Sequence, residues 1–385
     1  MLSPEERALV ARHLADDPTR LALQLRRQAG ARAAVVATQV ALLQRARHKL
    51  PTWAAARCEL ERTALEQANS EAAAALRFAG LQGERAIDLT GGLGVDSWQL
   101  ARQYRAVLYV EPQPERIELA RQNFETLGVL PRMQLLLHTA ESALTTLPEA
   151  DLIYLDPDRR ADGGRRIRLE AMQPDVLQLM PHLLALAPRV CVKLSPMLDA
   201  QELARRLPQA CRIEALGLQG ECKELLAWVQ REPASPHQWL ARGPGWQVAK
   251  GQPQPKLVPV AEPAVGKPDT WVYEADPAVY KMDLLAEAAQ QYLNEYRLTG
   301  PRGYALSDTD APAWPGRRWR LAGTLPAAQH ALKKMLTAAG ITAAFISGRE
   351  YPEKPELLRK RLKLKESSKL GLLFTPGAVY HVETG

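Results

Sequence analysis

Between residues 85 and 230, short apolar runs alternate regularly with amphipathic stretches. The runs are bounded by turn residues, which is typical of buried strands, and the stretches between them have helical spacing. Strands alternating with helices predict an α/β fold with a Rossmann-like, doubly wound sheet. We predict its strands at 86–89, 106–110, 133–138, 150–155, 190–194, 211–217 and 225–230.

The first 80 residues have helical periodicity instead. Leucine and valine recur at helical spacing among alanine and arginine, which are both good helix formers. Pro18 and Pro51 mark boundaries between segments. We therefore predict an N-terminal helical lobe over 1–80 and the sheet domain over 81–231.

Proline, glycine and glutamine become frequent after residue 231. This composition predicts a connecting region over 232–315, with a short hairpin around 239–250. A strand that begins at Trp271 and an amphipathic helix over 283–296 add a small ferredoxin-like α/β element to this region.

The remaining residues, 316–385, again mix short apolar runs with helical patterns. Their order, βαβαββ, predicts a small C-terminal α+β domain. We place its strands at 319–322, 343–346, 370–374 and 378–382, and its helices at 326–339 and 356–363.

The first predicted strand leads directly into a glycine-rich turn. Asp88 closes the strand, Gly91-Gly92-Leu93-Gly94 follows, and an amphipathic run begins at Ser97. Such a loop brings backbone N–H groups against a ligand at the start of a helix. The second strand ends in Glu111, whose carboxylate can accept both hydroxyls of a ribose. The pattern predicts a site for a nucleoside cofactor across the ends of the first two strands.

The glycine pattern also bears on which cofactor binds. A dinucleotide fingerprint has a third glycine where this chain has Ser97, and Asp96 would place a negative charge close to a pyrophosphate. S-adenosylmethionine carries no phosphate, and its sulfonium and amino groups are cationic. Acidic residues at Asp88 and Asp96 suit it better, so an NAD-dependent oxidoreductase is the less favoured alternative.

The fourth predicted strand, 150–155, ends in Asp156-Pro157. In open α/β sheets, ligands bind beyond the carboxyl ends of the strands, so this pair is expected beside the cofactor. A carboxylate and a rigid backbone carbonyl there can accept hydrogen bonds from an exocyclic amino group and aim its lone pair at a methyl group. Proline fixes the turn and removes a competing donor. Positioning of this kind supplies most of the rate of an in-line transfer.

The motifs at 88–96, Glu111 and Asp156-Pro157 resemble those of class I S-adenosylmethionine-dependent methyltransferases. Further segments resemble one bacterial group of these enzymes, which has a THUMP-like C-terminal domain. The similarity runs from about residue 50 to the end and implies such a domain over 316–385. The segments are Gln67-Ala68-Asn69-Ser70-Glu71, Val192-Lys193-Leu194-Ser195-Pro196-Met197, Glu221-Cys222-Lys223-Glu224-Leu225-Leu226, Tyr273-Glu274, Ala278-Val279 with Lys281, and Pro315-Gly316-Arg317.

The resemblance implies roles for individual residues. Backbone groups after the third strand, at Ala140-Glu141, would hold the adenine edge, although Glu141 also suits the first turn of the next helix. Residues 67–71 either close over the cofactor as a lid or only begin a helix capped by Ser70. The candidate catalytic residues are Asp156 and Pro157. The candidate cofactor-binding residues are Asp88, Thr90, Gly91, Gly92, Gly94, Asp96, Glu111, Pro112, Ala140 and Glu141.

One departure from the family pattern matters. Amino-methyltransferases carry a second proline and an aromatic residue where this chain has Asp158 and Arg159. An arginine plane also stacks on bases, so an amino nitrogen of an RNA base remains the favoured acceptor. No cysteine follows Pro157, which excludes a covalent thiol adduct at cytosine C5. The departure motivates one alternative, an RNA-binding protein whose methyltransferase fold is not catalytic.

The net charge of +7 and the pI near 9.2 favour a polyanionic partner such as tRNA or rRNA, although a soluble basic enzyme has a similar composition. Arginines cluster over 158–168, either as a clamp for substrate phosphates or as a solvated charge run. Lys193 either reaches the same crevice or forms a plain salt bridge. The predicted helix over 356–363 is basic and could contact an RNA backbone. The candidate substrate-binding residues are Arg159, Arg160 and Lys193.

Other classes of protein are disfavoured by the sequence. No apolar run approaches the roughly 20 residues of a membrane span. Ser3-Pro4-Glu5-Glu6 is a helix start and not a signal peptide, so we expect a cytoplasmic protein without a membrane. The four cysteines form no Cys-x-x-Cys pair and the seven histidines do not cluster, so we expect no metal.

Overall fold

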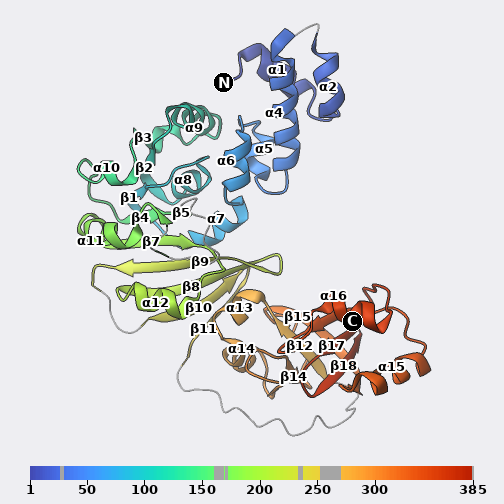
Figure 1. The fold of residues 1–385 in the computed structure, drawn as a ribbon. Coiled ribbons are helices and arrows are strands. Elements are labelled where there is room, and N and C mark those ends of the chain that lie inside the picture. Colours follow the sequence, from blue (N-terminus) through green and yellow to red (C-terminus); the bar gives the residue numbers. More distant parts are fainter. Residues whose placement is uncertain (27–29, 160–168, 170–171, 233–236, 252–269, 384–385) are drawn as a thin grey trace. The chain divides into compact units, whose positions relative to one another are not determined.

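The computed structural model describes residues 1–26, 30–159, 169, 172–232, 237–251 and 270–383 (Figure 1). Contacts between residues divide the chain into two units. The first consists of Met1–Ile213 with Leu225–His237, and the second of Glu214–Glu224 with Gln238–Gly385.

The N-terminal part of the first unit is helical, as predicted. Pro18 and Pro51 occupy the first position of a helix, where the fixed φ of proline is favourable and its missing N–H is not needed. The side chains of Ser3 and Ser70 cap two other helices by accepting backbone N–H groups. The elements are α1 (Pro4–Arg12), α2 (Pro18–Gln24), the 3-10 helix η1 (Gly30–Arg32), α4 (Ala33–Ala46), α5 (Pro51–Ala55), α6 (Arg62–Gln67) and α7 (Glu71–Arg77).

All seven strands predicted between residues 85 and 230 are present. They run in the order β8-β9-β7-β4-β1-β2-β3 within a nine-stranded sheet. The five neighbouring strands β3, β2, β1, β4 and β7 are parallel to one another, whereas β9 runs antiparallel to β7. They are β1 (Gly83–Asp88), β2 (Tyr104–Glu111), β3 (Met133–Leu137), β4 (Leu152–Leu155), β7 (Arg189–Leu194), β8 (Ala210–Leu218) and β9 (Glu221–Gln230).

Helices alternate with these strands (Figure 1). The first of these helices, α8, packs against α7 of the N-terminal lobe. From β1 the chain proceeds to β2 and β3 on one side, and after β3 it returns to β4 on the other side of β1. Ligands bind at such a switch point, beyond the carboxyl ends of the strands. The helices are α8 (Val95–Leu100), α9 (Pro114–Thr126), the 3-10 helix η2 (Leu130–Arg132), α10 (Ala140–Ala143), α11 (Val176–Leu186) and α12 (Ala200–Arg206). Two short strands, β5 (Asp158–Arg159) and β6 (Met172–Gln173), pair antiparallel after β4.

The second unit contains the predicted hairpin and a seven-stranded sheet in the order β13-β14-β12-β15-β18-β17-β16. Because β12 pairs antiparallel with β15, strands on both sides of residue 315 share this sheet. The elements are β10 (Gln238–Gly243), β11 (Trp246–Ala249), β12 (Trp271–Ala275), α13 (Pro277–Lys281), α14 (Leu285–Tyr292), β13 (Arg297–Leu298), β14 (Ala305–Ser307), β15 (Gly316–Pro326), α15 (Gln329–Ala338), β16 (Phe345–Gly348), α16 (Pro355–Leu362), β17 (Leu370–Phe374) and β18 (Ala378–Glu383).

Two boundaries in this unit differ from the sequence prediction. Strand β15 continues to Pro326, where pairing with Ala378 extends it, so the following helix begins at Gln329 and not at residue 326. The helix predicted over 283–296 ends at Tyr292. Helices α15 and α16 bury Leu332 and Leu358 in one core cluster with residues of β17.

Across the described residues, every helix is too short or too polar to cross a bilayer.

Candidate active site

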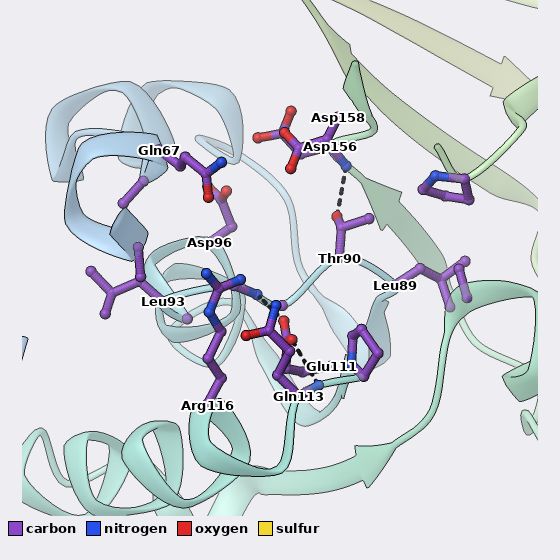
Figure 2. Close-up of a pocket in the computed structure, with 18 of the residues that line it drawn as sticks. Gln67, Leu89, Thr90, Leu93, Asp96, Glu111, Gln113, Arg116, Asp156 and Asp158 are labelled. Carbon is purple, nitrogen blue, oxygen red and sulfur yellow. Dashed lines mark hydrogen bonds between the residues drawn. The ribbon is translucent and has the colours of Figure 1, made fainter. Parts of the chain in front are cut away.

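A cavity of about 340 Å³ opens at the carboxyl ends of β1, β2 and β4 in the first unit (Figure 2). Its floor is the glycine loop between β1 and α8, and residues from the end of α6 line another side. Most of the predicted cofactor-binding residues and Asp156 come together here. Those that line it are Thr90, Gly91, Gly92, Gly94, Asp96, Glu111, Pro112, Ala140, Glu141 and Asp156.

The glycine loop is fixed from below by the end of β2. Glu111 accepts hydrogen bonds from the N–H groups of Gly92 (3.0 Å, Oε2) and Gln113 (3.0 Å, Oε1). The hydroxyl of Tyr109 donates to the carbonyl of Gly92 at 2.6 Å. Gly94 has a φ of +94°, and a Cβ there would lie 2.7 Å from Cζ of Phe124. Only glycine fits this position, which explains the glycine of the motif.

Asp88 lies beneath the loop and is fully buried, so it is not among the residues that line the cavity. Its carboxylate accepts the N–H of Thr90 (3.0 Å) and the hydroxyl of Ser97 (2.6 Å). Burial, with a smaller contribution from the charge of Asp96, raises the pKa of Asp88 to about 7. In this structure Asp88 shapes the loop, whereas the sequence had suggested direct contact with a cofactor.

Asp96, on the first turn of α8, is the centre of a polar cluster. Its carboxylate is paired with the fully buried side chain of Arg77 and accepts the hydroxyl of Tyr154 at 3.1 Å. Asn69, which precedes α7, donates from Nδ2 to Asp96 at 2.6 Å. The cluster therefore joins α7, α8 and β4, and it neutralises a buried carboxylate that would otherwise be costly.

Asp156 follows β4 and is held from three sides. Its backbone N–H donates to the hydroxyl of Thr90 at 2.7 Å (Figure 2). Its Oδ2 atom pairs with Nζ of Lys193 at 2.6 Å and accepts Nδ2 of Asn69 at 3.3 Å. Asp156 is a quarter exposed. Lys193, for which the sequence left two roles open, thus forms a salt bridge with the candidate catalytic residue. Pro157 is buried behind it.

Carboxylates predominate in the lining of the cavity, although Asp96 is paired with Arg77 and Asp156 with Lys193. Asp96, Asp156, Glu111 and Glu141 line it together with Asp158, and Arg116 is the only basic residue among the described lining. Burial raises the pKa of Glu111, and backbone hydrogen bonds oppose the shift. Burial also raises the pKa of Asp158, with a further contribution from the charge of Asp156. Such a surface favours a cationic ligand and disfavours a pyrophosphate.

The remaining predicted substrate-binding residues are only partly described. Arg159 forms β5 with Asp158, and its backbone alone is described. Arg160 and the rest of the arginine-rich segment 160–168 lie outside the described residues. In the part of the chain that is described, no group of three or more His, Cys, Asp or Glu side chains could hold a metal ion.

Comparisons relate this chain to known proteins. A sequence profile of the THUMP domain-like family matches residues 316–382. Two proteins of Mycobacterium tuberculosis, from strains CDC 1551 and H37Rv, are 27% identical over 324 residues, which cover 83% of this chain and 86% of theirs. Both are named as uncharacterized S-adenosylmethionine-dependent methyltransferases. A crystal structure of a candidate methyltransferase from Porphyromonas gingivalis W83 aligns with a TM-score of 0.82 and 24% identity, covering 100% of this chain and 99% of that one.

The chain is thus similar to S-adenosylmethionine-dependent methyltransferases over most of its length, has the fold of the Porphyromonas gingivalis protein, and matches the THUMP domain-like family at its C-terminal end. The resemblance found in the sequence is confirmed. Two residues that hold Asp96 beside the cavity had no recognisable signal in the sequence. Arg77 lies in an alanine-rich helix, and Tyr154 lies within a buried strand. Asn69 belonged to a recognised segment, but its contact with two carboxylates depends on how α7 packs against α8.

Proposed function

We propose that this protein binds S-adenosylmethionine in the acidic cavity and methylates an amino nitrogen of an RNA base. The observation that carries the proposal is the hydrogen bond between Thr90 and Asp156. It fixes the loop beneath the cofactor site directly against the residue that would orient the acceptor. Donor and acceptor sites are thus built as one framework, as in-line transfer requires.

The residues of the cavity fit this donor. Each oxygen of Glu111 accepts one backbone N–H and retains a lone pair, so the carboxylate can still accept the two hydroxyls of a ribose. The acidic lining suits the cationic sulfonium and amino groups, and it opposes the pyrophosphate of NAD. When bound, S-adenosylmethionine supplies an electrophilic methyl group on a positively charged sulfur.

Asp156 can orient an amino acceptor. Its Oδ2 atom is occupied by Lys193 and Asn69, whereas Oδ1 has no hydrogen-bond partner among the described residues. This free oxygen can accept an N–H of an exocyclic amino group and direct the nitrogen lone pair. In the transfer the N–C bond forms as the C–S bond breaks, and the nitrogen then loses one proton to solvent.

RNA is proposed as the substrate because of the net charge of the chain and the domain that it contains. The net charge is +7, and the second unit contains the region that matches the THUMP domain-like profile. Helix α16 carries Arg359, Lys360 and Arg361 in its last turn, where RNA phosphates could bind. The arginines that follow Asp156 in the sequence would add phosphate contacts beside the acceptor.

One alternative function, that of an RNA-binding protein without catalysis, is also supported by the residues of the cavity. Asp158 lines the cavity where other amino-methyltransferases have a proline, and an arginine follows in place of the aromatic residue. A protein that binds RNA and has lost catalysis would tolerate this change. Calorimetry with S-adenosylmethionine and with RNA separates the two cases, because the non-catalytic protein would bind RNA without the donor.

The decisive experiment replaces Asp156 with alanine. Methyl incorporation is measured with labelled S-adenosylmethionine and RNA extracted from cells that lack the gene, and the product nucleosides are identified by mass spectrometry. We expect Asp156→Ala to lower transfer by about 100-fold, while the donor affinity changes less than about threefold. Glu149→Ala, an exposed acid before β4, is the matched control. Unchanged transfer in Asp156→Ala would refute the assignment.

A further inference from the structure

The second unit has a larger cavity of its own, of about 900 Å³. We call it the second cavity. All its lining residues belong to Glu214–Glu224 or Gln238–Gly385. They come from the turn between β8 and β9, from β12, from the start of β15, from β16 and from α16. The residues that matter here are Trp246, Glu274, Arg317, Phe345, Arg349 and Arg359.

This cavity gathers motifs that methyl transfer does not use. Tyr273-Glu274 and Pro315-Gly316-Arg317 were recognised in the sequence without a role, and the register of β12 and β15 places Glu274 opposite Arg317. Gly316 has a φ of +147°, and a Cβ there would overlap the carbonyl oxygen of Glu274. Glycine at 316 therefore lets the two strands meet closely at the wall of the cavity.

Partly buried hydrogen bonds fix part of the wall. Glu274 accepts Nε of Arg349 at 2.8 Å and the hydroxyl of Ser347 at 2.9 Å. The guanidinium of Arg349 also lies over the ring of Tyr280, 3.9 Å from its centroid. The charge of Glu274 is thus neutralised, and Arg349 is held rigidly.

Two other arginines have hydrogen-bonding capacity to spare. Arg317 is exposed, and its side chain makes no hydrogen bond or ion pair with any described residue. Nε of Arg359 is buried without a hydrogen-bond partner among the described residues. Arg359 forms an ion pair with Glu366, another lining residue that is 77% exposed, but the 3.6 Å between Nη2 and Oε1 is too long for a hydrogen bond. A buried donor without a partner is costly, so an acceptor supplied by a ligand would be favourable.

Aromatic side chains line the same cavity. Trp246 rests on Gly243 and Gly217, where any Cβ would crowd its indole. Phe345 packs against Gly371 and lies 5.4 Å from the ring centre of Trp319. Both rings line the cavity and are held by backbone that leaves no room for larger neighbours. Arginines that can bind phosphate beside fixed aromatic rings are the elements with which proteins bind single-stranded RNA.

We propose that the second cavity binds an unpaired nucleotide of the RNA strand, with the phosphate on Arg317 and Arg359 and the base beside Trp246 and Phe345. The proposal rests on RNA being the substrate class of the proposed function. It assigns the second unit a contact of its own with the RNA strand, in addition to the contact of the first unit with the base that is methylated.

The test measures binding of a fluorescein-labelled decamer of uridylate to the full chain by anisotropy, without S-adenosylmethionine. The variant Arg317→Gln/Arg359→Gln is compared with Lys333→Gln/Lys334→Gln. The control removes the same charge from two exposed residues of α15 that do not line the cavity. We expect the arginine variant to bind about tenfold more weakly. The slope of log affinity against log salt should also decrease by about 1.4, the value for two lost phosphate contacts on a single strand.

Equal weakening in the two double variants would overturn the proposal, because it would indicate only a loss of general charge. Unchanged binding by the arginine variant would overturn it as well. Uridine monophosphate is used as a competitor to distinguish a mononucleotide ligand from an RNA strand. If it displaces the labelled decamer at the same concentrations as unlabelled decamer does, the ligand of the cavity would be a mononucleotide and not a strand. Calorimetry with S-adenosylmethionine is run in parallel. If the arginine variant loses RNA binding but still binds S-adenosylmethionine, the loss is assigned to this cavity. If the parent protein does not bind S-adenosylmethionine, the methyltransferase proposal is refuted.

Discussion

The backbone N–H of Asp156 donates a hydrogen bond to the hydroxyl of Thr90 at 2.7 Å. Thr90 belongs to the loop that follows β1, and Asp156 follows β4, so the bond links two strand ends that are 66 residues apart in the chain. It sets the distance between the residues that would hold the methyl donor and the one that would orient the acceptor.

Replacing Thr90 with valine keeps the shape of the side chain and removes the acceptor of this bond. We expect methyl transfer to fall about tenfold, because leaving a buried N–H unpaired costs about 1–3 kcal/mol and Asp156 can shift. Thr90→Ser, which keeps the hydroxyl, should behave like the parent. Transfer is measured with labelled S-adenosylmethionine and RNA from cells lacking the gene. Equal activity of the valine and serine variants would contradict this role.

Glu111 should be essential for holding the donor. Glu111→Ala removes both the ribose acceptor and the support of the Gly92 and Gln113 N–H groups, so we expect about 100-fold weaker binding of S-adenosylmethionine in calorimetry. Glu115→Gln, an exposed acid on α9 outside the cavity, is the control and should bind normally. Comparable affinities in the two variants would place the donor elsewhere.

Asn69 is expected to act as a positioning residue, since its amide bridges Asp96 and Asp156. In Asn69→Ala the two carboxylates lose their shared donor, and we expect the transfer rate to fall about tenfold with a smaller change in donor affinity. Gln67→Ala, which removes a neighbouring amide that also lines the cavity, should have less effect. The kcat and the donor KM are measured separately, and a change confined to KM would show that Asn69 only helps to bind the donor.

The buried carboxyl of Asp88 should make stability depend on pH. Its pKa is about 7 in the folded chain, above the ordinary value of 3.8, so the folded state binds more protons between these pH values. Stability should therefore fall as pH rises from 4 to 7, by about 1.4 kcal/mol per unit at most, and then level off.

In Asp88→Asn this contribution disappears. The free energy of unfolding, measured in urea at pH 5 and pH 7.5, should fall less with pH in the variant than in the parent. Glu125→Gln, which changes an exposed acid at the end of α9, should keep the slope of the parent. A slope that is identical in Asp88→Asn and the parent would show that Asp88 does not titrate in this range.

Local sequence signals located most of the first unit correctly. The seven predicted strands occur where apolar runs end at turn residues, and Gly94 is required by a positive φ next to Phe124. The glycine loop, Glu111 and Asp156 meet because the carboxyl ends of neighbouring parallel strands lie at one edge of a sheet. That rule needs only the order of strands and helices along the chain.

The sequence by itself determined the α/β fold class, the glycine loop and the acidic strand ends, because backbone conformation and burial leave local periodic patterns. Only the tertiary structure decided that Asp88 lies beneath the loop, that Asn69 contacts both Asp96 and Asp156, and that β12 and β15 share a sheet. These features depend on contacts between segments far apart in the chain. Which face of a helix packs on which neighbour, and which strand pairs with which, is set by the packing of the whole domain and not by any local pattern.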